Sequence, residues 1–169
     1  MSTTTESSPA DTSAPYPAGV WRRLAALVYD SFLLFGLLFL IGAIYVALDA
    51  WVTGVPATAD VQTGSVVTDL PDHRSPLLFV LEVLAVTGFY VYFWRKNGQT
   101  LGMQAWRLRL DDAVTGGRPS ARQCALRLLV GPVSLLCAGL GYWWIWVDGQ
   151  RRTWHDRASD TRVVVLPKR

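Results

Sequence analysis

Two long apolar runs dominate the pattern of the chain. Residues 31–48 (SFLLFGLLFLIGAIYVAL) carry no charge, and residues 24–30 extend this run backward. The result is a helix of roughly 25 residues, enough to cross about 30 Å of hydrocarbon. Residues 76–94 form a second run, interrupted only by Glu82 and ending in aromatic residues typical of a membrane interface. We therefore predict two transmembrane helices.

The distribution of charge predicts how these helices are oriented. The connection 49–75 between them lacks the Lys and Arg excess that marks cytoplasmic loops. The pair Arg22 and Arg23 before the first run, the connection 95–123 and the tail after residue 147 are all basic. We therefore expect both termini in the cytoplasm and the connection 49–75 outside.

A third apolar region, residues 124–147, contains its own helix breakers. These are Gly131 with Pro132, and then Gly139 and Gly141. A broken or re-entrant hairpin would return the basic tail to the cytoplasmic side. A simple third crossing is the alternative, and it would leave that tail outside.

Polar segments indicate short structured elements and one tail. Residues 105–110 (AWRLRL) alternate in polarity and residues 161–167 (TRVVVLP) are β-branched, so the two could pair as short cytoplasmic strands. Ser120 with Gln123 makes a capping box at the start of the third region. Residues 1–19 are rich in Ser, Thr, Pro and Ala, which predicts a disordered tail before a membrane domain over residues 20–169. The predicted fold class is an all-α membrane protein with this small β-pairing.

Composition supports a membrane protein and excludes several other classes. The chain is 51% hydrophobic and 17% charged, and its net charge of +3 is broken up by apolar blocks, which argues against a nucleic-acid partner. Cys124 and Cys137 lie in the third region without a CxxC motif or a nearby histidine pair. We interpret both as small core residues and predict neither a metal site nor a cofactor.

Three ionisable residues lie within or beside the apolar regions: Asp30, Glu82 and Arg127. Such groups usually face the protein interior and mark an ion pair or a pathway. Asp30 could instead stay hydrated near the interface, and Glu82 could reach water at the outer side. For Arg127 we favour a side chain that extends to the inner surface, with an ion pair to Asp30 as the alternative hypothesis.

The segment 153–160 (TWHDRASD) places His155 beside Asp156, a combination that could support acid–base chemistry. The chain offers no accompanying nucleophile and no GxSxG, HExxH or P-loop signature. We therefore do not expect an enzyme. We predict a structural role, with Asp156 capping a helix or pairing beside Arg151 and Arg152.

Three ordered motifs resemble the RDD family of prokaryotic membrane proteins: WRRLAALVYD, GQTLGMQAWRLRL and GYWWIWVDGQRRTWHDRASDTRVVV. The resemblance covers about residues 19–165. It places the arginine and two aspartates of the family name on Arg23, Asp30 and Asp156, with Asp148 as an alternative for the last. Asp160 departs from the small residue or glycine that is common before the threonine, which leaves the local turn open.

The resemblance implies a multi-pass protein of the prokaryotic cell membrane that takes part in transport, with sodium/proton exchange suggested for some members. Two to four crossings cannot enclose a pathway, so transport would require a homo-oligomer or another membrane protein. The alternative is a non-catalytic module that binds lipid or a membrane-protein partner. Its basic cytoplasmic face would also attract anionic lipids of the bilayer.

Overall fold

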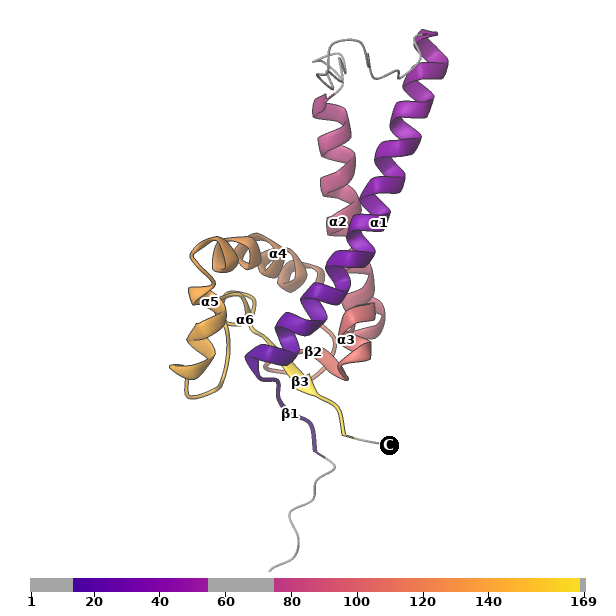
Figure 1. Cartoon of the computed structure of the whole chain (residues 1–169). Coiled ribbons are helices and arrows are strands. Elements are labelled where there is room, and N and C mark those ends of the chain that lie inside the picture. The colour runs from indigo at the N-terminus through magenta and orange to yellow at the C-terminus, as the bar shows by residue number, and fades with distance from the viewer. Residues whose placement is uncertain (1–13, 55–74, 168–169) are drawn as a thin grey trace, which may run out of the picture.

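Two long helices rise from a smaller folded body in the computed structural model, which describes residues 14–54 and 75–167 (Figure 1). Helix α1 (Val20–Thr53) and helix α2 (Ser75–Asn97) are long and apolar enough to cross a membrane, which confirms the two predicted spans. α1 has 34 residues, so it is about 51 Å long. It therefore extends beyond the hydrocarbon, and its first turns belong to the body.

A three-stranded antiparallel sheet lies in the body, with strand order β1-β3-β2. β2 (Leu108–Asp112) pairs with β3 (Thr161–Val165) along their whole length, which confirms the predicted pairing of these two segments. β1 (Tyr16–Pro17) adds to the free edge of β3. Part of the tail expected over residues 1–19 is thus ordered, while residues 1–13 lie outside the described residues.

The third apolar region forms a bent pair of helices. α4 (Ala121–Leu136) begins with the predicted capping box of Ser120 and Gln123, and α5 (Leu140–Trp143) continues into a 3₁₀ turn, η2 (Trp144–Trp146). The two parts meet at an angle of 107°. This confirms that the third apolar region is broken, as predicted, and both ends of the region lie in the body (Figure 1).

The break does not lie at the first pair of predicted breakers, Gly131 and Pro132. Pro132 lies inside α4, and the helix continues past it to Leu136. The chain turns instead at Ala138 and Gly139, whose φ angles are 52° and 73°. Glycine adopts this left-handed conformation without the cost that a Cβ imposes.

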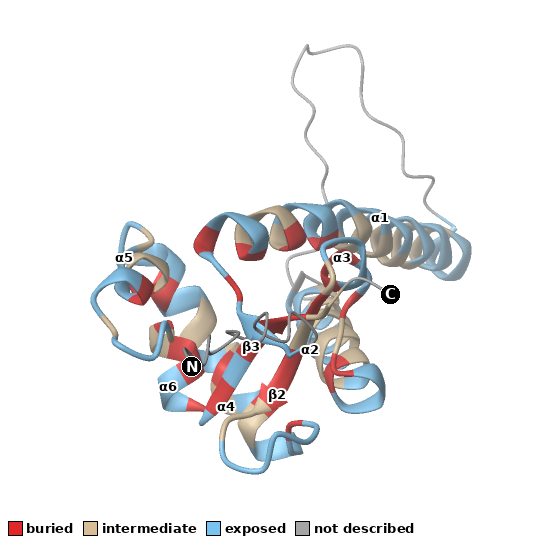
Figure 2. Cartoon of the chain, turned by 90° about the horizontal axis from the view of Figure 1, so that it is seen from below, coloured by how far each residue is buried: buried red, intermediate tan, exposed pale blue. Residues whose placement is uncertain are grey.

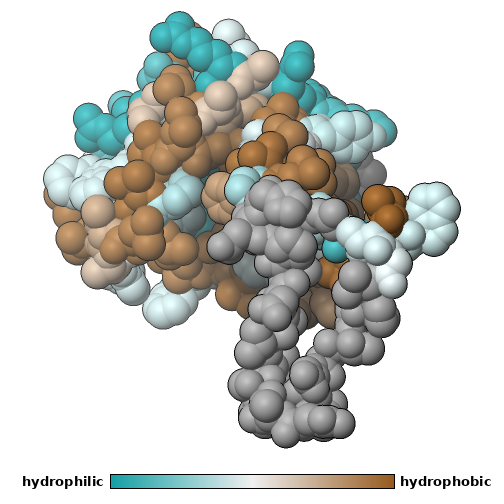
Figure 3. All heavy atoms as spheres, turned by 90° about the horizontal axis from the view of Figure 1, so that it is seen from above, coloured by the Kyte–Doolittle hydropathy of each residue, from teal (hydrophilic) through white to brown (hydrophobic). Residues whose placement is uncertain are grey.

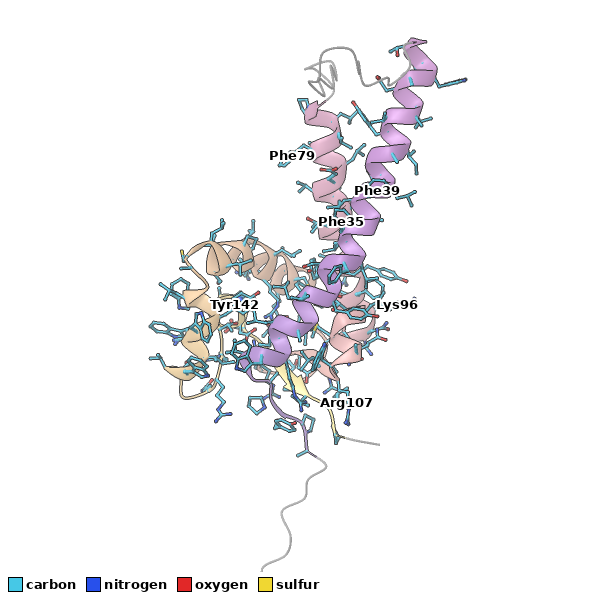
Figure 4. All side chains as sticks on the ribbon, in the orientation of Figure 1. Phe35, Phe39, Phe79, Lys96, Arg107 and Tyr142 are labelled. Carbon is cyan, nitrogen blue, oxygen red and sulfur yellow. The ribbon has the colours of Figure 1, made fainter. Side chains whose placement is uncertain are left out.

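Buried side chains concentrate in the body and are sparse along the spans (Figure 2). The core joins the base of α1, the end of α2, the short helix α3 (Leu101–Ala105), the sheet and the start of α4. A further short helix, α6 (Trp154–Ala158), precedes β3. Cys124 belongs to this core as predicted, whereas Cys137 is exposed, so its interpretation as a core residue was wrong. The exposed faces of α1 and α2 carry large apolar side chains that a bilayer would cover, such as Phe39 and Phe79 (Figure 4). Hydrophobic atoms also cover much of the face seen in Figure 3.

Candidate functional site

A buried ion cluster ties the base of α1 to the C-terminal part of the chain. The carboxylate of Asp156, on α6, accepts a hydrogen bond from Arg23 at one oxygen and from Arg127 at the other. Arg23 comes from α1 and Arg127 from α4, and all three side chains are buried. One carboxylate therefore joins three helices.

Contacts with a residue nearby in the chain orient the Asp156 carboxylate. The Thr153 hydroxyl accepts a hydrogen bond from the Asp156 N–H at 3.3 Å, and Asp156 Oδ2 accepts one from the Thr153 N–H at 3.2 Å. This reciprocal capping box starts α6 and orients the carboxylate. An acidic group at this end of a helix is also favoured by the helix dipole.

Each arginine has a second anchor. Arg23 donates from Nε to the carbonyl oxygen of Ala18 at 3.1 Å, which connects the cluster to the chain just after β1. Arg127 donates to the Thr161 hydroxyl at 3.0 Å, and its guanidinium lies 5.5 Å from the ring centre of Trp94. These contacts hold both cations in place and partly replace their lost hydration.

The two cations determine the protonation of the acidic and imidazole groups beside them. Burial alone would raise the pKa of Asp156, but the guanidiniums of Arg23 and Arg127 outweigh it and hold that pKa far below its usual range. Burial, with Arg127 next in importance, lowers the pKa of His155 to about 3. At neutral pH the cluster therefore contains two cations, one anion and a neutral imidazole.

A second buried contact involves Asp30, two turns further along α1. Asp30 is 3% exposed, and its carboxylate accepts hydrogen bonds from the Thr100 hydroxyl at 2.5 Å and the Gly102 N–H at 2.8 Å. A Cβ on Gly102 would lie 2.3 Å from the carbonyl oxygen of Ala26, so only glycine lets α3 approach α1 this closely. The protein's own donors occupy the Asp30 carboxylate.

A groove with one acidic group lies between the two spans. It encloses about 630 Å³, and the residues that line it come from α1, apart from Glu82 on α2: Phe35, Leu38, Phe39, Gly42, Ala43, Val46, Ala47, Ala50 and Glu82. Glu82 is half-buried, and none of the described residues gives its carboxylate a hydrogen bond or an ion pair. Figure 1 shows the two helices diverging along this stretch.

Residues 17–160 match the RDD family. The chain belongs to the RDD family. It is also 28% identical, over 88 residues, to an uncharacterised protein of Rickettsia prowazekii (strain Madrid E). The match covers 52% of this chain and 49% of that protein, so the chain spans about half the length of this curated relative. No solved structure matches the chain.

The structure separates the residues that the RDD resemblance grouped together. Arg23 and Asp156 contact each other, whereas Asp30 bonds to Thr100 and Gly102. The burial of Asp30 also rules out the interpretation that places it in water at the interface.

The prediction for Arg127 was wrong, and the prediction for Asp156 was confirmed in one of its two alternatives. Arg127 neither extends to the surface nor pairs with Asp30, because α4 packs on α6 and directs its guanidinium to Asp156. Asp156 does cap α6 as predicted, but its partners are not Arg151 and Arg152. The acid that pairs with Arg152 is Asp148. Its carboxylate oxygens lie 3.9 Å from Arg152 Nε and 3.2 Å from a guanidinium nitrogen of Arg157.

Several contributors to the site went unnoticed in the sequence. Thr100 and Thr153 each occupy the N-cap of a short helix, a signal that a threonine before a brief helical segment could have provided. Gly102 and Thr161 carry no local signal, because their roles depend on neighbours distant in the sequence. Asp160 adopts a φ of 48°, so the turn before β3 uses the left-handed conformation that favours glycine.

Proposed function

We propose that this RDD protein is a subunit of a transporter that exchanges a small cation for a proton, with the Glu82 carboxylate as the exchanging group. The observation that supports the proposal is the Glu82 carboxylate in the groove between the spans, to which none of the described residues bonds. The buried acids among the described residues, Asp30, Asp111 and Asp156, all accept hydrogen bonds from internal donors. They serve the architecture and leave Glu82 to carry the ion.

The position of Glu82 supports this role. It lies seven residues after the start of α2, about 10 Å along the helix axis. An ionised carboxylate at membrane depth without a partner costs a few kcal/mol, so it favours a bound proton or a bound cation. One carboxylate that holds either ion, but not both, is the simplest chemistry for exchange.

A second copy of the chain completes the proposed pathway. Two spans cannot enclose one, and the α1 side of the groove includes Gly42, Ala43 and Ala47, whose small side chains allow another helix to approach closely. A symmetric dimer would also bring two Glu82 carboxylates to one interface. A cation would then have acidic oxygens from both copies.

The proposed setting is a prokaryotic cell membrane, with both termini in the cytoplasm. Basic residues at the ends of the spans, such as Arg23 and Lys96, lie at the end that joins the body. The strands β1 and β3, near opposite ends of the chain, pair in that same body. This arrangement supports a bent α4–α5 pair that enters and leaves on one side.

The test uses purified protein in liposomes that contain a pH-sensitive dye, with pulses of sodium, potassium or lithium. The wild type is compared with Glu82→Gln and Glu82→Asp, and Asp160→Asn serves as a control that neutralises an exposed acid in the body. We expect a cation-driven signal that is lost in Glu82→Gln, kept in part in Glu82→Asp and unchanged in Asp160→Asn.

Two results would overturn the proposal. A signal that persists in Glu82→Gln would remove Glu82 from the pathway. Absence of any signal from well-inserted wild-type protein would favour the alternative, a non-catalytic module that binds lipid or another membrane protein.

A further inference from the structure

A second pocket, of about 350 Å³, lies in the body and is separate from the groove between the spans. It forms where β1 and β3 meet the base of α1 and the segment before α6. The residues that line it include four arginines and no acidic residue: Pro17, Arg23, Ala113, Gln150, Arg151, Arg152, Arg162, Val163 and Val164. The wall therefore combines a concentrated positive charge with an apolar floor from β3.

The four arginines differ in how far internal partners neutralise them. Arg23 is paired with Asp156. Arg151 and Arg162 are exposed, and the described residues give neither guanidinium a hydrogen bond or an ion pair. Two cations thus face the pocket without a counter-charge from the described part of the chain.

Arg152 provides a second, independent indication. Its Nε is buried and lacks a hydrogen-bond partner among the described atoms. The nearest carboxylate oxygen, from Asp148, lies 3.9 Å away, beyond hydrogen-bond distance. Arg152 therefore adds to the wall a third guanidinium whose internal counter-charge is distant.

We infer that this pocket binds a phosphate group, carried either by a soluble compound or by a lipid headgroup. Guanidinium groups recognise phosphate oxygens with paired, charge-assisted hydrogen bonds. The two unpaired arginines suit a phosphate group, which carries one negative charge as a lipid diester and up to two as a monoester, and the Gln150 amide can donate a further bond. The volume accommodates the phosphate together with a small attached group.

The site is placed to affect the spans. Arg23 lines the pocket and also anchors the base of α1 to Asp156. A bound anion would therefore contact the residue that connects the body to the first span. This inference does not depend on the role proposed for Glu82, since the two sites share no lining residue.

Thermal unfolding of the full chain tests the inference, because a ligand that binds only the folded state raises its stability with concentration. In neutral detergent the probe is inorganic phosphate. In nanodiscs the probe is phosphatidylglycerol added to phosphatidylcholine. The variant Arg151→Gln with Arg162→Gln removes two exposed charges, and Arg95→Gln with Arg122→Gln removes two exposed charges away from the pocket.

We expect the pocket variant to need about tenfold more ligand than the wild type for equal stabilisation, and the control variant to match the wild type. A response to inorganic phosphate would identify a soluble phosphate compound as the ligand class. A response to phosphatidylglycerol alone would identify a lipid headgroup. Stabilisation by neither probe, or an equal loss in both variants, would overturn the inference.

Discussion

Asp156→Asn tests how strongly the ion cluster stabilises the protein. The substitution keeps a side-chain oxygen that can accept the Thr153 N–H, so the cap of α6 is largely retained. It removes the counter-charge that Arg23 and Arg127 share, and leaves two buried cations close to each other. Breaking a buried ion pair in this way costs about 3–5 kcal/mol. For a chain of this size the melting temperature would fall by about 6–20 °C.

The same geometry predicts a smaller effect for Arg127→Met. Asp156 would keep Arg23, so a neutral ion pair would remain. The loss is then the Arg127–Asp156 ion pair, partly offset because one cation fewer is buried, together with the hydrogen bond to Thr161 and the contact with Trp94, in total about 1–3 kcal/mol. In the double variant with Asp156→Asn, removal of the second cation should restore about 1–3 kcal/mol relative to the sum of the single effects.

The assay is unfolding of purified protein in detergent by titration with a denaturing detergent, followed by tryptophan fluorescence. Asp160→Asn is the matched control: it is the same chemical change at an exposed position, and asparagine tolerates the left-handed backbone there. We expect this control to lie within about 0.5 kcal/mol of the wild type. The stabilising role of the ion cluster is refuted if Asp156→Asn is as stable as the Asp160→Asn control, or if Arg127→Met destabilises the protein more than Asp156→Asn does.

Two further predictions concern pH and packing. The pKa of His155 is near 3 in the folded state, below its ordinary value of 6.5, so the unfolded state binds more protons as the pH falls from 6.5. Stability should then drop by up to about 1.4 kcal/mol per pH unit between pH 6 and 4.5, and unfolding at several pH values should show a shallower slope for His155→Phe. Gly102→Ala would push a methyl group against the Ala26 carbonyl and should cost about 1–3 kcal/mol in the same unfolding assay. Gly88→Ala, with open space around it, should have little effect, and equal losses in the two variants would refute the close approach.

Local patterns in the sequence predicted the spans, the cap at Ser120 and the strand pairing. Hydropathy over twenty residues, a reciprocal cap over four and β-branched alternation all act between neighbours in the chain, so they can be recognised without the fold. The break at Gly139 followed the same logic. Pro132 did not end its helix, because packing on neighbouring elements can maintain a helix past a proline whose cost is about 3 kcal/mol.

The ion contacts could not be assigned from the sequence. Arg127 and Asp156 are separated by 29 positions, and Asp30 and Thr100 by 70. Which carboxylate an arginine reaches depends on how α1, α4 and α6 pack, and local patterns in the sequence do not reveal that packing. Arg127 was therefore interpreted from its length and charge alone, an interpretation that fits an exposed arginine and fails for a buried one.

The role proposed for Glu82 can be tested by the initial rate of pH change inside liposomes after a sodium pulse, compared between wild type and Glu82→Gln at equal amounts of inserted protein. We expect the wild type to respond in proportion to sodium and Glu82→Gln to be slower by at least about tenfold, since this substitution removes the carboxylate proposed to hold either ion. Equal rates in the two proteins would contradict the role proposed for Glu82.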